Sequence, residues 1–122
     1  MLLAHLHLLE KLQTVSTKYR LQKAGEAFPA NVMRHYYDIY CLLTLPEIQE
    51  FIGTPAYEAR KVQRFRSGDE LVAAKNPAFL LEGPEDRVRF ASEYRKTSAL
   101  YYNGQPDLDE IQARIRQYID KM

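Results

Sequence analysis

The sequence predicts an all-α fold, a compact bundle of about five to six helices. Apolar residues recur at helical spacing in several long segments, and glycine and proline fall between these segments, where helices end and begin. No segment shows the alternation of apolar and polar residues that a half-buried strand requires. The chain has 122 residues, of which 46% are hydrophobic, so we expect residues 1–122 to form a single helical domain.

The first predicted helix covers residues 2–24 and is apolar on two neighbouring faces. One face consists of Leu8, Leu12, Val15 and Tyr19. The other consists of Leu2, Leu6 and Leu9. Such a helix needs neighbours on several sides, and a polar stripe remains for solvent: His7, Lys11, Thr14 and Lys18. Gly25 ends the helix.

The second predicted helix, residues 32–44 with Asn31 as its N-cap, places charged residues in an apolar segment. Arg34 and Asp38 are one turn apart and can pair. Residues 39–43 are apolar on every side, which predicts a buried helix with Cys41 as a small core residue. A carboxylate in such a helix needs a partner, so Asp38 is either a structural ion-pair residue or a functional group.

Two further helices are predicted to begin at prolines. Pro46 opens a short helix over residues 46–51, and Pro55, with Thr54 as N-cap, opens the next. The exposed side of that helix is expected to carry a basic cluster of Arg60, Lys61, Arg64 and Arg66. With no interleaved aromatic residue beyond Phe65, this cluster is more typical of a solvated face than of a phosphate-binding surface.

The last third of the chain contains one irregular segment and two helices. Residues 70–83 follow no regular pattern. Pro84 starts a helix that we expect to reach about residue 102, with Val88, Ala91 and Tyr94 on its shared face. The final helix begins at Pro106-Asp107 and ends near residue 120.

Charge and cysteine content limit the classes of function. Lys plus Arg is 17 and Asp plus Glu is 16, and this net charge of +1 indicates neither a nucleic-acid nor a membrane partner. The single cysteine allows no intrachain disulfide, which is typical of a reducing compartment. No apolar run approaches the roughly 20 residues of a membrane span, and the apolar start lacks the basic region of a signal peptide. We therefore expect a cytoplasmic protein.

No self-contained catalytic motif is visible. The sequence has no glycine-rich phosphate loop and no G-x-S-x-G. His5 and His7 point to different helix faces, so we expect no metal site from them. An independent enzyme using Asp38 and His35 would lack a second carboxylate or a nucleophile–base pair. Lys11 is either a surface lysine or a cation positioned for phosphate.

Several segments, taken in order, resemble the C-terminal part of the AbiEii/AbiGii-type nucleotidyltransferase toxins. These segments are Leu9-Glu10-Lys11-Leu12, Lys18-Tyr19-Arg20, Arg34-His35-Tyr36-Tyr37-Asp38-Ile39-Tyr40, Glu93-Tyr94 and Leu100 to Ile111. The last segment is similar to that family's G-x-P-x-F-D-E-I-like ending, with Leu108 in place of the usual aromatic residue. The resemblance covers nearly the whole chain.

The resemblance implies roles for four residues. Lys11 matches the lysine of the family's third motif, and Arg34 and Asp38 match the arginine and aspartate of the fourth. Nucleotide binding is thereby implied for Lys11, Arg34 and His35, and a catalytic or supporting role for the Asp38 carboxylate. The complete family protein would use Mg²⁺ and a nucleoside triphosphate. If this correspondence is right, Lys11 and Asp38 lie close together in the fold.

In the family, a G-G-T-x-L-like segment and a D-x-D pair precede the lysine motif; neither stands ahead of Lys11 in this sequence, and with them the metal-binding carboxylates are missing. We therefore expect the C-terminal helical portion of a toxin–antitoxin or phage abortive-infection nucleotidyltransferase, inactive and without a cofactor on its own. Its partner would be a separately encoded N-terminal half or an antitoxin. The alternative is a non-enzymatic helical interaction module, in which a homo-oligomer or a protein partner covers the side formed by Leu2, Leu3, Leu6 and Leu9.

Overall fold

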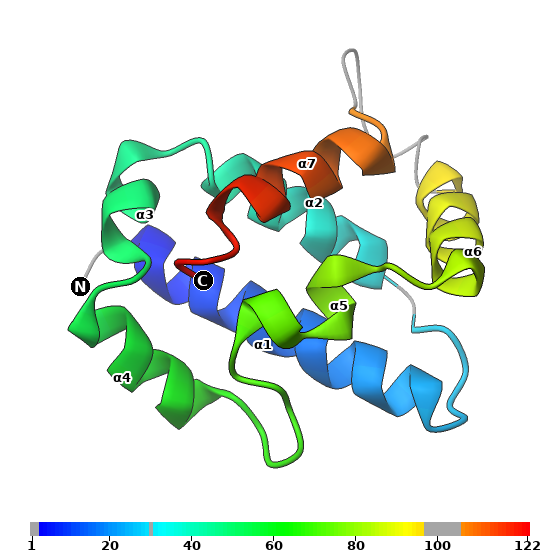
Figure 1. Cartoon of the computed structure of the whole chain (residues 1–122), viewed down its shortest axis with the longest axis horizontal. Coiled ribbons are helices and arrows are strands. Elements are labelled where there is room, and N and C mark those ends of the chain that lie inside the picture. Colours follow the sequence, from blue (N-terminus) through cyan, green and yellow to red (C-terminus); the bar gives the residue numbers. More distant parts are fainter. Residues whose placement is uncertain (1–2, 30, 97–105) are drawn as a thin grey trace.

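The computed structural model describes residues 3–29, 31–96 and 106–122. Within these ranges the chain forms seven α-helices and one short 3-10 helix and has no strand, which confirms the all-α prediction (Figure 1). The helices are α1 (Leu3–Lys23), α2 (Val32–Leu42), α3 (Pro46–Phe51), α4 (Pro55–Arg64), α5 (Pro77–Leu80), α6 (Pro84–Arg95) and α7 (Leu108–Tyr118), with the 3-10 helix at Ala73–Lys75. No helix in these ranges has both the length and the apolar character needed to cross a bilayer.

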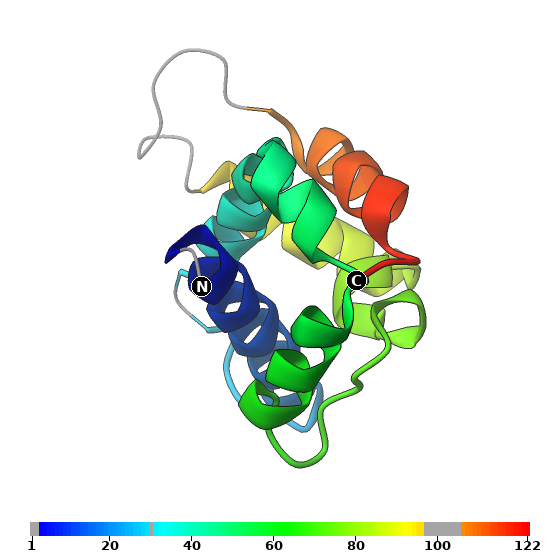
Figure 2. The ribbon, with the colours of Figure 1, turned by 90° about the vertical axis from the view of Figure 1, so that its left-hand side faces the viewer.

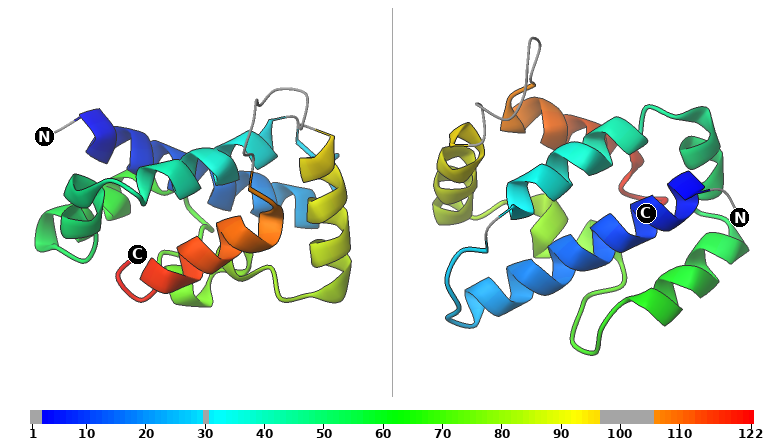
Figure 3. Two further views of the ribbon diagram at one scale, coloured as in Figure 1. Left: turned by 90° about the horizontal axis from the view of Figure 1, so that it is seen from above. Right: turned by 180° about the vertical axis from the view of Figure 1, so that it is seen from behind.

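Helix α1 is the centre of the fold. It contacts α2, α3, α4 and α5, and the view from behind shows it between α2 and α4 (Figure 3). The predicted apolar face is buried: Leu8, Leu12, Val15 and Tyr19. Burying an aliphatic side chain of this size stabilises the fold by about 1.5–3 kcal/mol, so this face alone fixes α1 in the core.

The remaining helices build a second layer over α2. Helix α7 contacts α2 and α5, and α6 lies across one end, where it contacts α2 and α7 (Figure 2). The predicted stripe of α7 is buried at Leu108, Ile111 and Ile115. The ring of Phe90 joins α6 to the core through tilted and edge contacts with the rings of Tyr19, Phe28 and Tyr36.

Proline and short polar side chains define most helix starts. Thr54 Oγ1 accepts a hydrogen bond of 3.1 Å from the Tyr57 amide, which confirms the predicted cap of α4. Asn76 caps α5 in the same way, through a 3.0 Å bond from the Ala78 amide. Residues 70–83, which were predicted to be irregular, therefore contain a short helix. Asn31 occupies the predicted N-cap position of α2, but it has φ 69° and its side chain makes no capping bond.

Three side chains lie elsewhere than predicted. Lys61 is only 3% exposed, and its ammonium lies over the Tyr57 ring and donates to the Met122 carbonyl. Cys41 is exposed, since the α2 face that carries it is not covered. Val88 is exposed because Phe90 and Tyr94 face the core instead.

The predicted end of the sixth helix differs as well. Helix α6 ends at Arg95 rather than near residue 102, and most of the expected extension falls on residues 97–105, outside the described residues. The part of the resembling tail that spans residues 100–105 lies outside them too.

Candidate functional site

The predicted approach of Lys11 and Asp38 is confirmed. Lys11 Nζ, on α1, lies 3.3 Å from Asp38 Oδ2, on α2, and the two side chains are 26% and 29% exposed. The ion pair therefore sits at the rim of the α1–α2 interface, where water partly screens it and where a ligand can reach it.

The possible pair between Arg34 and Asp38 is not formed. Arg34 is exposed on α2, and in the described part of the chain it takes part in no ion pair. Asp38 instead pairs across the helix interface with Lys11. The guanidinium of Arg34 remains a positive charge beside this pair, close enough to lower the pKa of its neighbour His35.

His35 lies next to the ion pair and is half-buried. Burial is the main cause that lowers its pKa from the ordinary 6.5, and the positive charges of Lys11 and Arg34 act in the same direction. The carboxylates of Asp38 and Glu10 oppose this shift. The imidazole is therefore neutral at neutral pH, and its buried Nδ1 has no hydrogen-bond partner within the described ranges. Because Nδ1 is buried, a ligand could bond only to Nε2 of this ring.

These side chains form one group, the Lys11–Asp38 cluster, which consists of Glu10, Lys11, Arg34, His35 and Asp38. The structure brings together all four residues that the sequence predicted and adds Glu10, whose charge acts on His35. The position of Glu10 directly before Lys11 in the sequence was the signal that could have identified it. The cluster offers an ammonium, a guanidinium and a neutral imidazole, which are the donors that bind an anion such as phosphate.

The residues do not fit a magnesium site formed by this chain. In the part of the chain that the structure describes, no three His, Cys, Asp or Glu side chains are grouped to hold a metal ion. Mg²⁺ requires octahedral oxygen coordination, usually with one or two carboxylates, and Asp38 already pairs with Lys11. The Mg²⁺ that the family resemblance implies would need carboxylates from another polypeptide.

Two other carboxylates serve as structural anchors that the sequence did not reveal. Asp69, whose side chain is fully buried, accepts bonds from Thr17 Oγ1 (2.6 Å), Arg20 Nε (3.0 Å) and the Arg66 amide (3.0 Å). Asp86 accepts bonds from the Tyr19 hydroxyl and, at 2.9 Å, from Lys23 Nζ. The side-chain partners lie on α1, far away in the sequence, so spacing gives no signal for these bonds.

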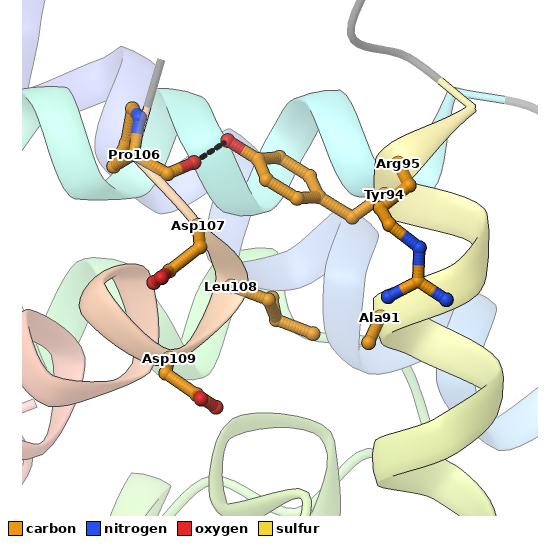
Figure 4. Close-up of a pocket in the computed structure, with 7 residues that line it drawn as sticks. All are labelled: Ala91, Tyr94, Arg95, Pro106, Asp107, Leu108 and Asp109. Carbon is orange, nitrogen blue, oxygen red and sulfur yellow. Dashed lines mark hydrogen bonds between the residues drawn. The ribbon is translucent and has the colours of Figure 1, made fainter. Parts of the chain in front are cut away.

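A pocket of about 440 Å³ lies between α6 and α7, apart from the cluster (Figure 4). Its lining residues are Ala91, Tyr94, Arg95, Pro106, Asp107, Leu108 and Asp109. The Tyr94 hydroxyl donates to the Pro106 carbonyl at 2.6 Å, and Asp107 caps α7 by accepting from the Glu110 amide at 2.8 Å. The first bond joins α6 to the segment before α7, and the second is a cap within α7.

No protein-family model, curated protein or solved structure matches the chain. The resemblance to the AbiEii/AbiGii-type nucleotidyltransferases therefore stays a prediction. It depends on the order of the quoted segments, and the contact between Lys11 and Asp38 is an independent geometric observation that agrees with it.

Proposed function

We propose that the chain is the helical, phosphate-binding portion of an AbiEii-type nucleotidyltransferase, completed by a separately encoded polypeptide or regulated by an antitoxin. The observation that carries the proposal is the 3.3 Å contact between Lys11 and Asp38. In this role Lys11 and Arg34 bind phosphate oxygens of a nucleoside triphosphate, and His35 supplies one hydrogen bond. Asp38 is the supporting carboxylate, and the Mg²⁺ ligands come from the other polypeptide.

The geometry of the cluster supports simultaneous binding of Asp38 and a phosphate by the same lysine. An ammonium has three N–H donors, and the Asp38 carboxylate does not use all of them. Asp38 therefore fixes the direction of the Lys11 side chain without blocking it. Partial exposure leaves room for a ligand, and the neutral His35 adds no charge that would require a counterion.

The test is a titration of isotope-labelled protein with ATP, GTP, CTP and UTP, followed by amide chemical shifts. We expect shifts at residues 10–11 and 34–38. Lys11→Met should weaken binding by about tenfold or more, the loss expected for one charge-assisted hydrogen bond. The matched control is Lys18→Met, which removes an exposed lysine from the same polar stripe of α1. The proposal is wrong if no triphosphate shifts these signals or if both variants bind equally.

The second candidate function, a helical interaction module, is favoured by a different observation. Leu3 is 67% exposed and Leu6 is 45% exposed on α1, whereas Leu9 is buried by the chain itself and Leu2 lies outside the described residues. Adjacent exposed leucines are an apolar patch that a partner can cover. Light scattering over a range of concentrations tests self-association, and Leu6→Glu should abolish any dimer. A strict monomer at every concentration would exclude the homo-oligomer.

A further inference from the structure

A groove between α1 and α4 combines an apolar floor with a basic rim. Its volume is about 340 Å³, and its lining residues are Leu6, Leu9 and Glu10 from α1 and Arg60, Gln63 and Arg64 from α4. Leu9 is buried beneath the groove, and Leu6 is partly open to solvent. The sequence placed Arg60 and Arg64 on a solvated face, but it gave no indication that this face borders exposed leucine.

The charges of the groove are only partly satisfied by the chain itself. Arg64 Nη2 lies 3.8 Å from Glu10 Oε2, and both side chains are more than half exposed, so this pair is weak and readily exchanged. Arg60, one turn before Arg64 on the same face of α4, takes part in no ion pair within the described ranges. Two guanidinium groups against one carboxylate leave a positive rim beside the apolar floor.

We infer that this groove is the docking site of an acidic amphipathic helix on a partner protein. The partner's apolar side chain would pack against Leu6 and Leu9, and its carboxylates would bind Arg60 and Arg64. A guanidinium presents a planar fork of donors that matches a carboxylate, and two of them spaced by one helical turn match acidic residues of the same spacing. This inference rests on the second candidate function, and the groove shares only Glu10 with the Lys11–Asp38 cluster.

The positive charge of the groove rim determines which kind of partner can bind in the groove. A basic helix would face two like charges, and such juxtaposition disfavours a partner. In the described residues, a second copy of the chain offers exposed acidic and apolar pairs on α6, Glu85 with Val88, and on α4, Glu58 with Val62. Docking of α6 into this groove would be a heterologous contact, which forms a ring or an open filament rather than a twofold dimer, and docking of α4 would bring the arginines of two copies together. We therefore assign the groove to a different chain.

The test uses two synthetic helical peptides of about 18 residues, long enough to be partly helical alone. They share the same leucine positions, and the flanking charges are glutamate in one and lysine in the other. Fluorescence anisotropy with the full chain should show binding of the acidic peptide and a marked loss of affinity at high salt. The lysine peptide should not bind.

The double variant Arg60→Glu/Arg64→Glu should reverse the preference, so that the lysine peptide binds and the glutamate peptide is weakened by at least tenfold. This gain of binding cannot come from misfolding. The matched control is Lys18→Glu/Lys75→Glu, which changes the net charge equally at exposed lysines outside the groove. Equal binding of both peptides, binding of neither, or a dimer of the wild-type chain that the double variant dissociates would overturn the inference. Nucleotide binding is tested separately with the wild-type chain and Lys11→Met, so failure of peptide binding does not decide that proposal.

Discussion

The contact between Lys11 and Asp38 can be tested by a double-mutant cycle. Lys11→Met keeps the apolar stem and removes the charge, and Asp38→Asn keeps the shape of the carboxylate. The two single variants and the double variant then give the coupling free energy between the two side chains. The same set reports on His35, because Lys11 lowers the pKa of the imidazole and Asp38 raises it.

The expected magnitude follows from the distance and the exposure of the pair. Unit charges 3.3 Å apart attract by about 1.3 kcal/mol in bulk water and by about 5 kcal/mol at an effective dielectric constant near 20. Partial desolvation and the fixing of two side chains offset most of this attraction. Because both side chains are roughly a quarter exposed, we expect a coupling free energy of about 1 kcal/mol.

Urea denaturation measures the coupling, and NMR titration of the imidazole protons measures the pKa of His35. Lys11→Met should raise this pKa, because a positive neighbour is removed, and Asp38→Asn should lower it, because a negative neighbour is removed. A coupling indistinguishable from zero, together with an unchanged pKa in both variants, would refute the proposed arrangement of the cluster.

Three other predictions concern the buried Asp69 carboxylate, the pKa of His35 and the Thr54 cap of α4. Asp69→Ala should lower the free energy of unfolding by about 2–4 kcal/mol, because three donors lose a buried acceptor. The control is Asp109→Ala, at an 82% exposed side chain, which should cost less than about 0.5 kcal/mol. Equal losses for the two variants in urea denaturation would contradict this. The wild-type protein should lose stability as the pH falls below 6.5, because unfolded His35 takes up a proton that the folded, half-buried imidazole resists. Thermal denaturation should show this slope reduced in His35→Gln and retained in His7→Gln, and an unchanged slope in the first variant would count against the lowered pKa. Thr54→Ala should cost about 1 kcal/mol through loss of the α4 cap, and failure of Thr54→Ser to restore stability would argue against capping.

Local chemistry determined most of what the sequence could predict. Proline at the first helical position and a capping hydroxyl at Thr54 act within a few residues, so the starts of α3, α4 and α6 were predicted correctly. The apolar spacing of α1 and α7 likewise identified their buried faces. The helix within residues 70–83 was not predicted, because Asn76 caps a helix of a single turn that periodicity cannot detect.

Tertiary contacts determined what the sequence could not predict. Tyr57 and Lys61 lie one turn apart on the buried face of α4, and half-buried Phe65 follows at its C-cap. Residue type alone assigned Lys61 to solvent, but its ammonium lies over the Tyr57 ring and reaches the Met122 carbonyl. Long-range acceptors of this kind decide the burial of a charged residue, and nothing in the spacing of α4 identifies them.

The same distinction explains the candidate site. From helical spacing, Asp38 could pair with Arg34 on its own helix, but in the structure it pairs with Lys11 on α1. The choice depends on how α1 and α2 pack, and the burial of Leu8 and Leu12 on α1 against the core fixes that packing. Arg34 is left exposed and unpaired with Asp38, so the cluster keeps one cation that no carboxylate in the described residues neutralises. A purely structural ion pair needs no second cation at the same rim, and the Arg34 guanidinium, which forms no ion pair in the described residues, is the feature that favours an anionic ligand.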